Sequence, residues 1–193
     1  MTRAGELRRR LVHVAGTGYP LLYLLDRHFD VGVVTWPRLQ GLVVASALVA
    51  LGLEAFRLTG RLDWAIYDAL TREYEQDYLA GYALYMIGMA VAVLAFQPRV
   101  ALPSVLMLTV ADPISGLLSA GNLAKSLVVI LVTFGVCLLL AAPFVPPPVA
   151  VAGALVATVA DGVKPVVATY VIDDNLTIPI GAGAAMTLTL AVV

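Results

Sequence analysis

Apolar residues make up 61% of this 193-residue chain, and charged residues make up only 13%. With a mean hydropathy of +0.92, the chain has more apolar surface than a water-soluble domain of this size can bury in its core. The net charge of −1 provides no basic field, which argues against a nucleic-acid partner. The composition therefore predicts a single integral membrane domain over residues 1–193.

Apolar runs of a length close to that of a bilayer crossing recur along the whole chain. We expect each run to form a helix, because a helix satisfies its own backbone hydrogen bonds in lipid. The sequence therefore predicts an all-α, polytopic transmembrane bundle of about seven spans. In chain order these are Leu11–Leu25, Leu39–Phe56, Leu79–Phe96, Val100 to about Leu118, Ser126–Val145, Val149 to about Ala160, and Ile178–Val193.

The positions of the basic residues predict the orientation of this bundle. If the amino terminus is cytosolic, only Arg27, Arg38 and Arg99 of the 12 basic residues lie on the outer side, as the positive-inside rule requires. The same multi-pass topology gathers the unusual polar residues near the cytosolic face, where nucleotides are available. These residues are Asp112, Lys125, Asp161, Lys164, Asp173, Asp174 and Asn175.

Asp112 is the most informative single residue, because a carboxylate inside an apolar run costs at least a few kcal/mol unless it is paired, hydrated or metal-bound. Pro113 suits the first position of a new helix, which would make Asp112 its N-cap. The amides of Ser115 and Gly116 would then point toward an anion. The alternative is purely structural: Asp112 only caps the helix, and the small residues after it form a packing face.

Lys125 and the segment around residues 160–179 supply further candidates. The Lys125 ammonium can contact a phosphate, although a lysine at a helix end is also a common snorkelling anchor. Asp173, Asp174 and Asn175 offer hard oxygen ligands of the kind that Mg²⁺ shares with phosphates. They can equally cap the following helix. Asp161 lies three residues before Lys164 and can simply pair with it.

His13 is the remaining titratable candidate, near the predicted cytosolic end of the first span. A histidine there can serve as a general base or as a hydrogen-bonded interface residue. Walker loops, zinc-binding patterns, Ser-His-Asp sets and dinucleotide fingerprints are all missing from the sequence.

Three motifs in order, ELRRRLVH at residues 6–13, ADPISGLL followed by KS in the middle, and DDNLTIP before the last span, resemble one family. It is the family of CTP-dependent polyisoprenoid-alcohol kinases, which includes dolichol kinase, phytol kinase and CTP-dependent diacylglycerol kinase. The resemblance covers nearly the whole chain. Its CTP-binding motif, carried over residue by residue, points to Asp112, Ser115, Lys125 and Ser126.

The resemblance implies transfer of the γ-phosphate of CTP to the hydroxyl of a lipid such as dolichol, with Mg²⁺ as the metal. Asp112 and Asp174 would hold the metal, with support from Asp173 and Asn175, so Asp112 and the 173–175 segment should lie close together in the fold. Lys125 would contact the phosphates, and Asp161 or His13 would be the base. A cytidylyltransferase that acts on a phosphorylated lipid needs the same nucleotide and metal. A transporter or an inactive membrane scaffold is the alternative from another class.

Overall fold

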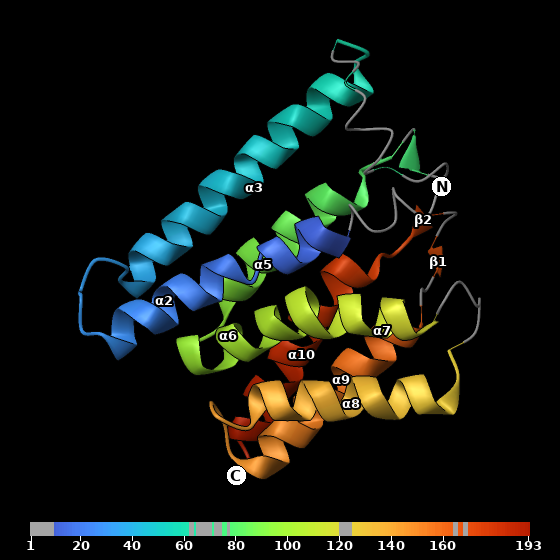
Figure 1. The fold of residues 1–193 in the computed structure, drawn as a ribbon. Coiled ribbons are helices and arrows are strands. Elements are labelled where there is room, and N and C mark those ends of the chain that lie inside the picture. The colour runs from blue at the N-terminus through green and yellow to red at the C-terminus, as the bar shows by residue number, and fades with distance from the viewer. Residues whose placement is uncertain are drawn as a thin grey trace.

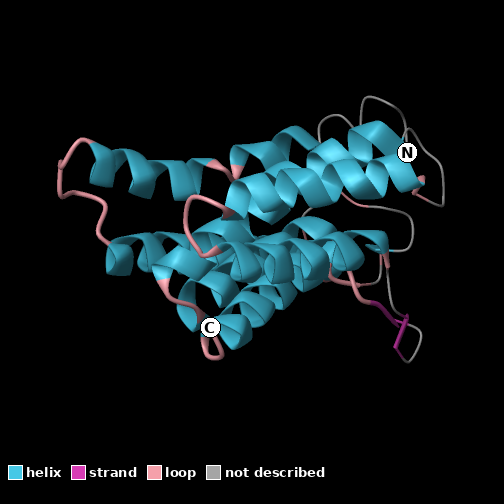
Figure 2. Cartoon of the chain, turned by 90° about the horizontal axis from the view of Figure 1, so that it is seen from below, coloured by secondary structure: helices cyan, strands magenta, loops and turns pink. Residues whose placement is uncertain are grey.

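The computed structural model describes residues 10–61, 64, 71, 75–76, 78–119, 125–163, 166–167 and 170–193. These residues form helices apart from loops and one short hairpin, and the helices lie side by side in a bundle (Figures 1 and 2). The helices are α2 (Gly18–His28), α3 (Trp36–Leu58), α5 (Gly81–Ala95), α6 (Pro98–Leu106), the π-helical turn η2 (Met107–Ala111), α7 (Asp112–Ser119), α8 (Leu127–Ala141), α9 (Pro147–Gly162) and α10 (Asp174–Leu190). Strands β1 (Val166–Val167) and β2 (Tyr170–Val171) pair antiparallel between α9 and α10.

The predicted all-α class is confirmed at this level, because each of the seven predicted runs coincides with helix. The first run is divided at Gly16 and Thr17, so that residues 10–15 and α2 form separate helical pieces. Within the described ranges, two helices are long and apolar enough to cross a membrane, Trp36–Leu58 and Pro98–Ser119. The helices Gly81–Ala95, Leu127–Ala141 and Pro147–Gly162 are apolar but shorter. Seven membrane crossings therefore stay a prediction.

The fourth run differs from its predicted structure in one detail. Pro98–Ser119 is one continuous helix, so Asp112 lies inside it and is not an N-cap, and the amides of Ser115 and Gly116 do not stand at a free helix end. The helix tolerates Pro113 because the turn before it is a π-turn, in which the Asp112 amide donates to the Met107 carbonyl. This wider turn relieves the clash between a proline ring and the preceding turn.

The C-terminal helix α10 is central to the packing, since it contacts α9, α5 and α6, while α3 packs on α5 and α8 packs on α9. Glycines allow the closest approaches. A Cβ atom at Gly153 would lie 2.6 Å from the Met186 side chain, and one at Gly183 would lie 2.2 Å from the Phe96 ring. Small residues at such contacts are typical of helices that pack closely in lipid.

Gly88 on α5 provides the first testable prediction. A Cβ atom there would lie 2.3 Å from the backbone carbonyl oxygen of Asn175 and 3.1 Å from Cγ of Pro179. Because a carbonyl oxygen cannot rotate away, Gly88→Ala must push α10 from α5, and we expect a loss of about 1–3 kcal/mol in the free energy of unfolding. The measurement is the thermal unfolding midpoint in detergent.

Gly41→Ala is the matched control for this substitution. Gly41 lies inside α3 and a Cβ atom there meets nothing within 4 Å. Gly41→Ala should raise the free energy of unfolding by about 0.5–1 kcal/mol, because alanine has a higher helix propensity than glycine. Equal melting temperatures for the two variants would contradict the close contact of α5 with α10.

Candidate functional site

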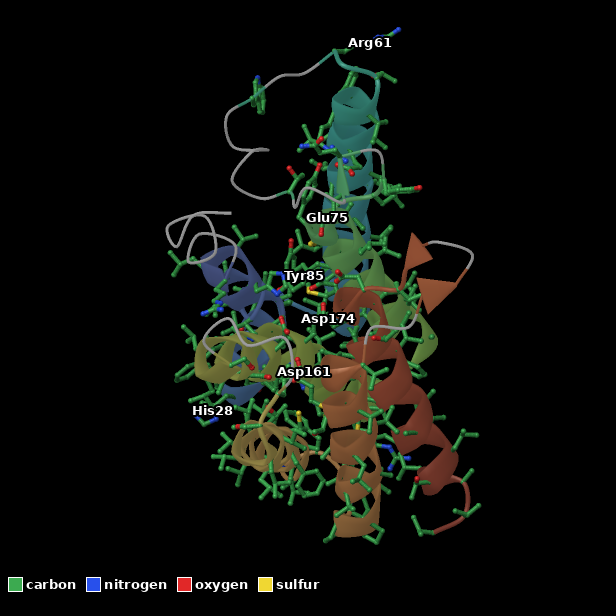
Figure 3. All side chains as sticks on the ribbon, turned by 90° about the vertical axis from the view of Figure 1, so that its right-hand side faces the viewer. His28, Arg61, Glu75, Tyr85, Asp161 and Asp174 are labelled. Carbon is green, nitrogen blue, oxygen red and sulfur yellow. The ribbon has the colours of Figure 1, made fainter. Side chains whose placement is uncertain are left out.

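Three carboxylates from three helices converge inside the bundle. Asp112 begins α7, Asp161 lies in the last turn of α9, and Asp174 begins α10. One carboxylate oxygen of each lies within 4.8 Å of the others, a spacing at which a single metal ion can contact all three. The hairpin between α9 and α10 returns the chain so that Asp174 faces Asp161 (Figure 3). The predicted proximity of Asp112 to the 173–175 segment is confirmed, and Asp161 joins them.

Lys125 provides the positive charge beside these carboxylates. Its Nζ lies 2.5 Å from Oδ2 of Asp161 and donates to Oγ of Ser115 at 2.8 Å. The Ser115 hydroxyl in turn donates to the same Asp161 oxygen at 2.7 Å. The Lys125 side chain is only 20% exposed and points into the bundle, unlike a snorkelling lysine. Asp161 pairs here with Lys125; Lys164, its other predicted partner, lies outside the described residues.

At the start of α10, the neighbouring residues Asp173 and Asp174 have different roles. Asp173 is outside the group of three carboxylates, and it is the N-cap of α10, where its Oδ1 accepts the Asn175 amide N–H at 3.0 Å. The Asn175 side-chain amide also donates to that oxygen. Asp173 thus has the capping role that the sequence left open as its alternative, whereas Asp174 points toward Asp112 and Asp161.

His13 lies on the other side of Asp112. Its Nδ1 is 3.1 Å from Oδ2 of Asp112, and its ring packs on the Tyr85 ring with centroids 4.6 Å apart. The Tyr85 hydroxyl donates to the His13 carbonyl oxygen at 2.7 Å. Gly16 permits this contact, since a Cβ atom there would lie 1.8 Å from the Tyr85 oxygen. Sequence reasoning missed Tyr85; its only signal is a phenol in an apolar run.

The remaining residues taken from the sequence lie around this centre. Gly116 contributes its carbonyl oxygen, which accepts from Arg10 at 2.8 Å. Ser126 caps α8 by accepting the Val129 amide N–H at 3.3 Å. Both residues were predicted to bind nucleotide, and that role stays a prediction.

Two buried oxygens at the site lack a hydrogen-bond partner within the part of the chain that the structure describes. They are Oδ1 of Asp161 and Oδ1 of Asn175, and both residues are at most 3% exposed. Buried polar atoms are nearly always paired, so both oxygens are available to accept from a ligand or to bind a cation. Every candidate ligand atom is a hard oxygen. Mg²⁺ prefers such ligands, whereas softer metals prefer nitrogen or sulfur. The residues therefore fit a Mg²⁺ ion.

Comparison of the chain with protein-family models, with curated proteins and with solved structures gives no match. The resemblance described above stays a prediction from the three motifs.

Proposed function

We propose that this protein is a membrane lipid kinase that transfers the γ-phosphate of CTP to a polyisoprenoid alcohol. The observation that carries the proposal is the convergence of Asp112, Asp161 and Asp174 within 4.8 Å, with Lys125 against Asp161. Phosphoryl transfer asks a protein mainly to position its substrates and to neutralise charge. Carboxylates that bind a divalent cation, together with one lysine, supply both.

Asp112, Asp161 and Asp174 would hold the Mg²⁺ ion, and Asn175, which follows Asp174 in the chain, has a buried Oδ1 without a partner among the described residues. Mg²⁺ bound there would neutralise charge on the β- and γ-phosphates of CTP. This ligand set contains Asp161, predicted from the sequence as a candidate base, in place of Asp173.

Lys125 would leave Asp161 when the nucleotide enters and contact the phosphates as a point charge. Its two present partners, Asp161 and Ser115, keep the ammonium inside the bundle and ready for that contact. Ser115 is thereby a residue that positions the lysine, consistent with its place in the CTP-binding motif that the sequence resembles.

His13 is the better candidate base, because Asp161 already accepts from Ser115 and Lys125. If His13 donates its Nδ1 proton to Asp112, its Nε2 is the acceptor. The lipid hydroxyl would pass its proton to Nε2 while its oxygen bonds to the γ-phosphorus. The bond from that phosphorus to the β–γ bridging oxygen breaks, and CDP leaves.

The apolar surface of the bundle supports a membrane location for this reaction. Only 28% of the most apolar 18-residue stretch of α3 is buried. The exposed side chains of this helix include the large hydrophobic residues Leu42, Leu48 and Phe56. The outer side of α8 is similar, with Leu127, Leu131 and Leu139 exposed. Lipid around these faces would place a membrane alcohol beside the site.

The decisive experiment supplies the purified protein in lipid nanodiscs with Mg²⁺, a panel of lipid alcohols, and CTP or ATP labelled at the γ-phosphate. We expect labelled lipid phosphate and CDP, with CTP preferred. Pyrophosphate as the leaving product with a phosphorylated lipid would instead indicate a cytidylyltransferase. Folded protein that transfers no label to any alcohol would overturn the proposal.

The proposed orientation gives a second prediction. Single cysteines are introduced at Arg61, after α3, and at Pro147, the first residue of α9, in a Cys137→Ala background that removes the lone native thiol. With a cytosolic amino terminus, a membrane-impermeant maleimide should label Pro147→Cys in intact cells. It should label Arg61→Cys only after permeabilisation. The reverse pattern would overturn the cytosolic placement of the site.

A further inference from the structure

Arg10 places a second cation beside the candidate site. Its guanidinium donates to the carbonyl oxygen of Gly116 at 2.8 Å and lies against the side of that glycine where a side chain would begin. A Cβ atom on Gly116 would lie 3.5 Å from Nε and 3.6 Å from Nη2 of Arg10. The guanidinium is therefore held on the surface of α7, although the two residues are 106 positions apart in sequence.

A neighbouring contact fixes Arg10 one helical turn away from the three carboxylates. His13, three residues after Arg10 in the helical segment 10–15, contacts Asp112 at 3.1 Å. Asp112 lies four residues before Gly116 in α7, and residues with this spacing lie on the same face of a helix, about 5–6 Å apart. The segment 10–15 thus runs antiparallel to α7, with His13 beside Asp112 and Arg10 one turn nearer the carboxyl end of that helix.

Lys125 occupies the neighbouring position on α7. It donates to Ser115, the residue that precedes Gly116, so two cations contact successive residues of one helical turn. The three carboxylates of the site exceed this lysine in charge, and a nucleotide brings further negative charge. Oxyanions that approach such a site need cations in addition to the metal. Arg10 provides one, within reach of phosphates bound to a metal at Asp112.

We propose that Arg10 is a phosphate-binding residue for the nucleotide, and that the polyphosphate chain runs from the metal at Asp112 along α7 toward Gly116. A planar guanidinium can make two parallel hydrogen bonds to one phosphate, which an ammonium cannot. Gly116 permits this arrangement, because a longer side chain there would occupy the place of the guanidinium. The inference rests on the proposed function, since it names a further residue that binds the same nucleotide.

The test measures ligand affinities of the purified full-length protein in nanodiscs of neutral lipid. Mn²⁺ stands in for Mg²⁺, and the nucleotide is a CTP analogue whose β–γ bridge cannot be cleaved. Arg10→Met should weaken binding of the analogue about 10–100-fold, the effect of losing charge-assisted hydrogen bonds. Mn²⁺ affinity without nucleotide, measured by electron paramagnetic resonance, should not fall, because Arg10 is not a metal ligand. A purely structural arginine would instead weaken both, by displacing His13 and Asp112.

Three further variants separate the charge of Arg10 from its position. Gly116→Leu keeps the cation but displaces it from α7, so it should weaken nucleotide binding as Arg10→Met does, and the double variant should be no weaker than either. Arg10→Lys keeps the charge without the paired hydrogen bonds and should bind with intermediate affinity. Arg99→Met is the control, since Arg99 is exposed at the start of α6, and should bind normally. If Gly116→Leu does not fold, the Arg10 variants still decide.

The possible outcomes keep the two hypotheses apart. Unchanged nucleotide affinity in Arg10→Met, or an equal loss of Mn²⁺ affinity, would overturn only the further inference. Normal binding of the CTP analogue with weaker binding of a phosphorylated lipid would place Arg10 at the acceptor and overturn it as well. Wild-type protein that binds Mn²⁺ but no nucleotide would remove the proposed function and the inference with it.

Discussion

Replacing Asp112 by Asn should lower lipid phosphorylation by about a hundredfold or more while leaving the fold intact. The substitution removes one of three converging carboxylates, and with it much of the affinity for Mg²⁺ and the charge compensation in the transition state. Asn retains an oxygen that can accept the hydrogen bond from His13, and Asp112 does not act as a helix cap. The melting temperature in detergent should therefore be unchanged or higher, because a costly charge and its repulsion with Asp161 are both removed.

Asp30→Asn is the matched control for this experiment. Asp30 is an exposed loop residue with a positive φ of 52°, a conformation that asparagine also tolerates. The control changes the net charge equally and should leave initial rates and Mn²⁺ affinity unaltered. Near-normal turnover in Asp112→Asn at moderate Mg²⁺ concentration would show that the reaction does not depend on this carboxylate.

Lys125→Met should change catalysis and metal affinity in opposite directions. Loss of the phosphate contact should lower the rate at saturating CTP and Mg²⁺ by about a hundredfold. The same substitution removes the cation that now occupies Asp161 at 2.5 Å, so Mn²⁺ should bind more tightly. Initial rates and Mn²⁺ titrations measure the two effects.

The stability of Lys125→Met adds an independent check. In the presence of a metal chelator, the unpaired buried carboxylate of Asp161 should lower the free energy of unfolding by about 3–5 kcal/mol. Added Mg²⁺ should then raise the melting temperature of the variant more than that of the wild type. Combining the substitution with Asp161→Asn should restore stability without metal, because no buried charge is left unpaired. Weaker Mn²⁺ binding in Lys125→Met would mean that the lysine supports the metal site and does not compete with it.

The helices could be predicted from sequence because long apolar runs impose helical structure whatever their neighbours are. The cost of a carboxylate inside an apolar run likewise identified Asp112 as a candidate without any knowledge of its partners. The convergence of Asp112 with Asp174 was predicted from the need of one cation to touch both. The observed convergence depends on the antiparallel packing of α9 on α10, which the short hairpin between them allows.

What could not be predicted depends on contacts between distant segments. Asp161 lies 46 residues from Ser115, its hydrogen-bond partner. The charged residue nearest to it in sequence is Lys164, whereas its ion-pair partner in the structure is Lys125. Arg57 enters the topology prediction only as one of the basic residues on the inner side, although it forms an ion pair with the buried Glu54 three residues earlier. Pro113 was interpreted as a helix start, because the sequence does not show that a π-turn accommodates it.

That π-turn sets the direction in which Asp112 and Ser115 point from the helix axis. Each residue of an α-helix advances by about 100° around the axis, and a π-turn is equivalent to one inserted residue. Asp112 and Ser115 follow Met107–Ala111, so both face Asp161 only because of this extra residue. A one-residue deletion in that turn would rotate both side chains away by about 100° while hardly changing hydropathy. Chains almost identical to this one in composition and predicted spans can therefore differ in whether they possess the site.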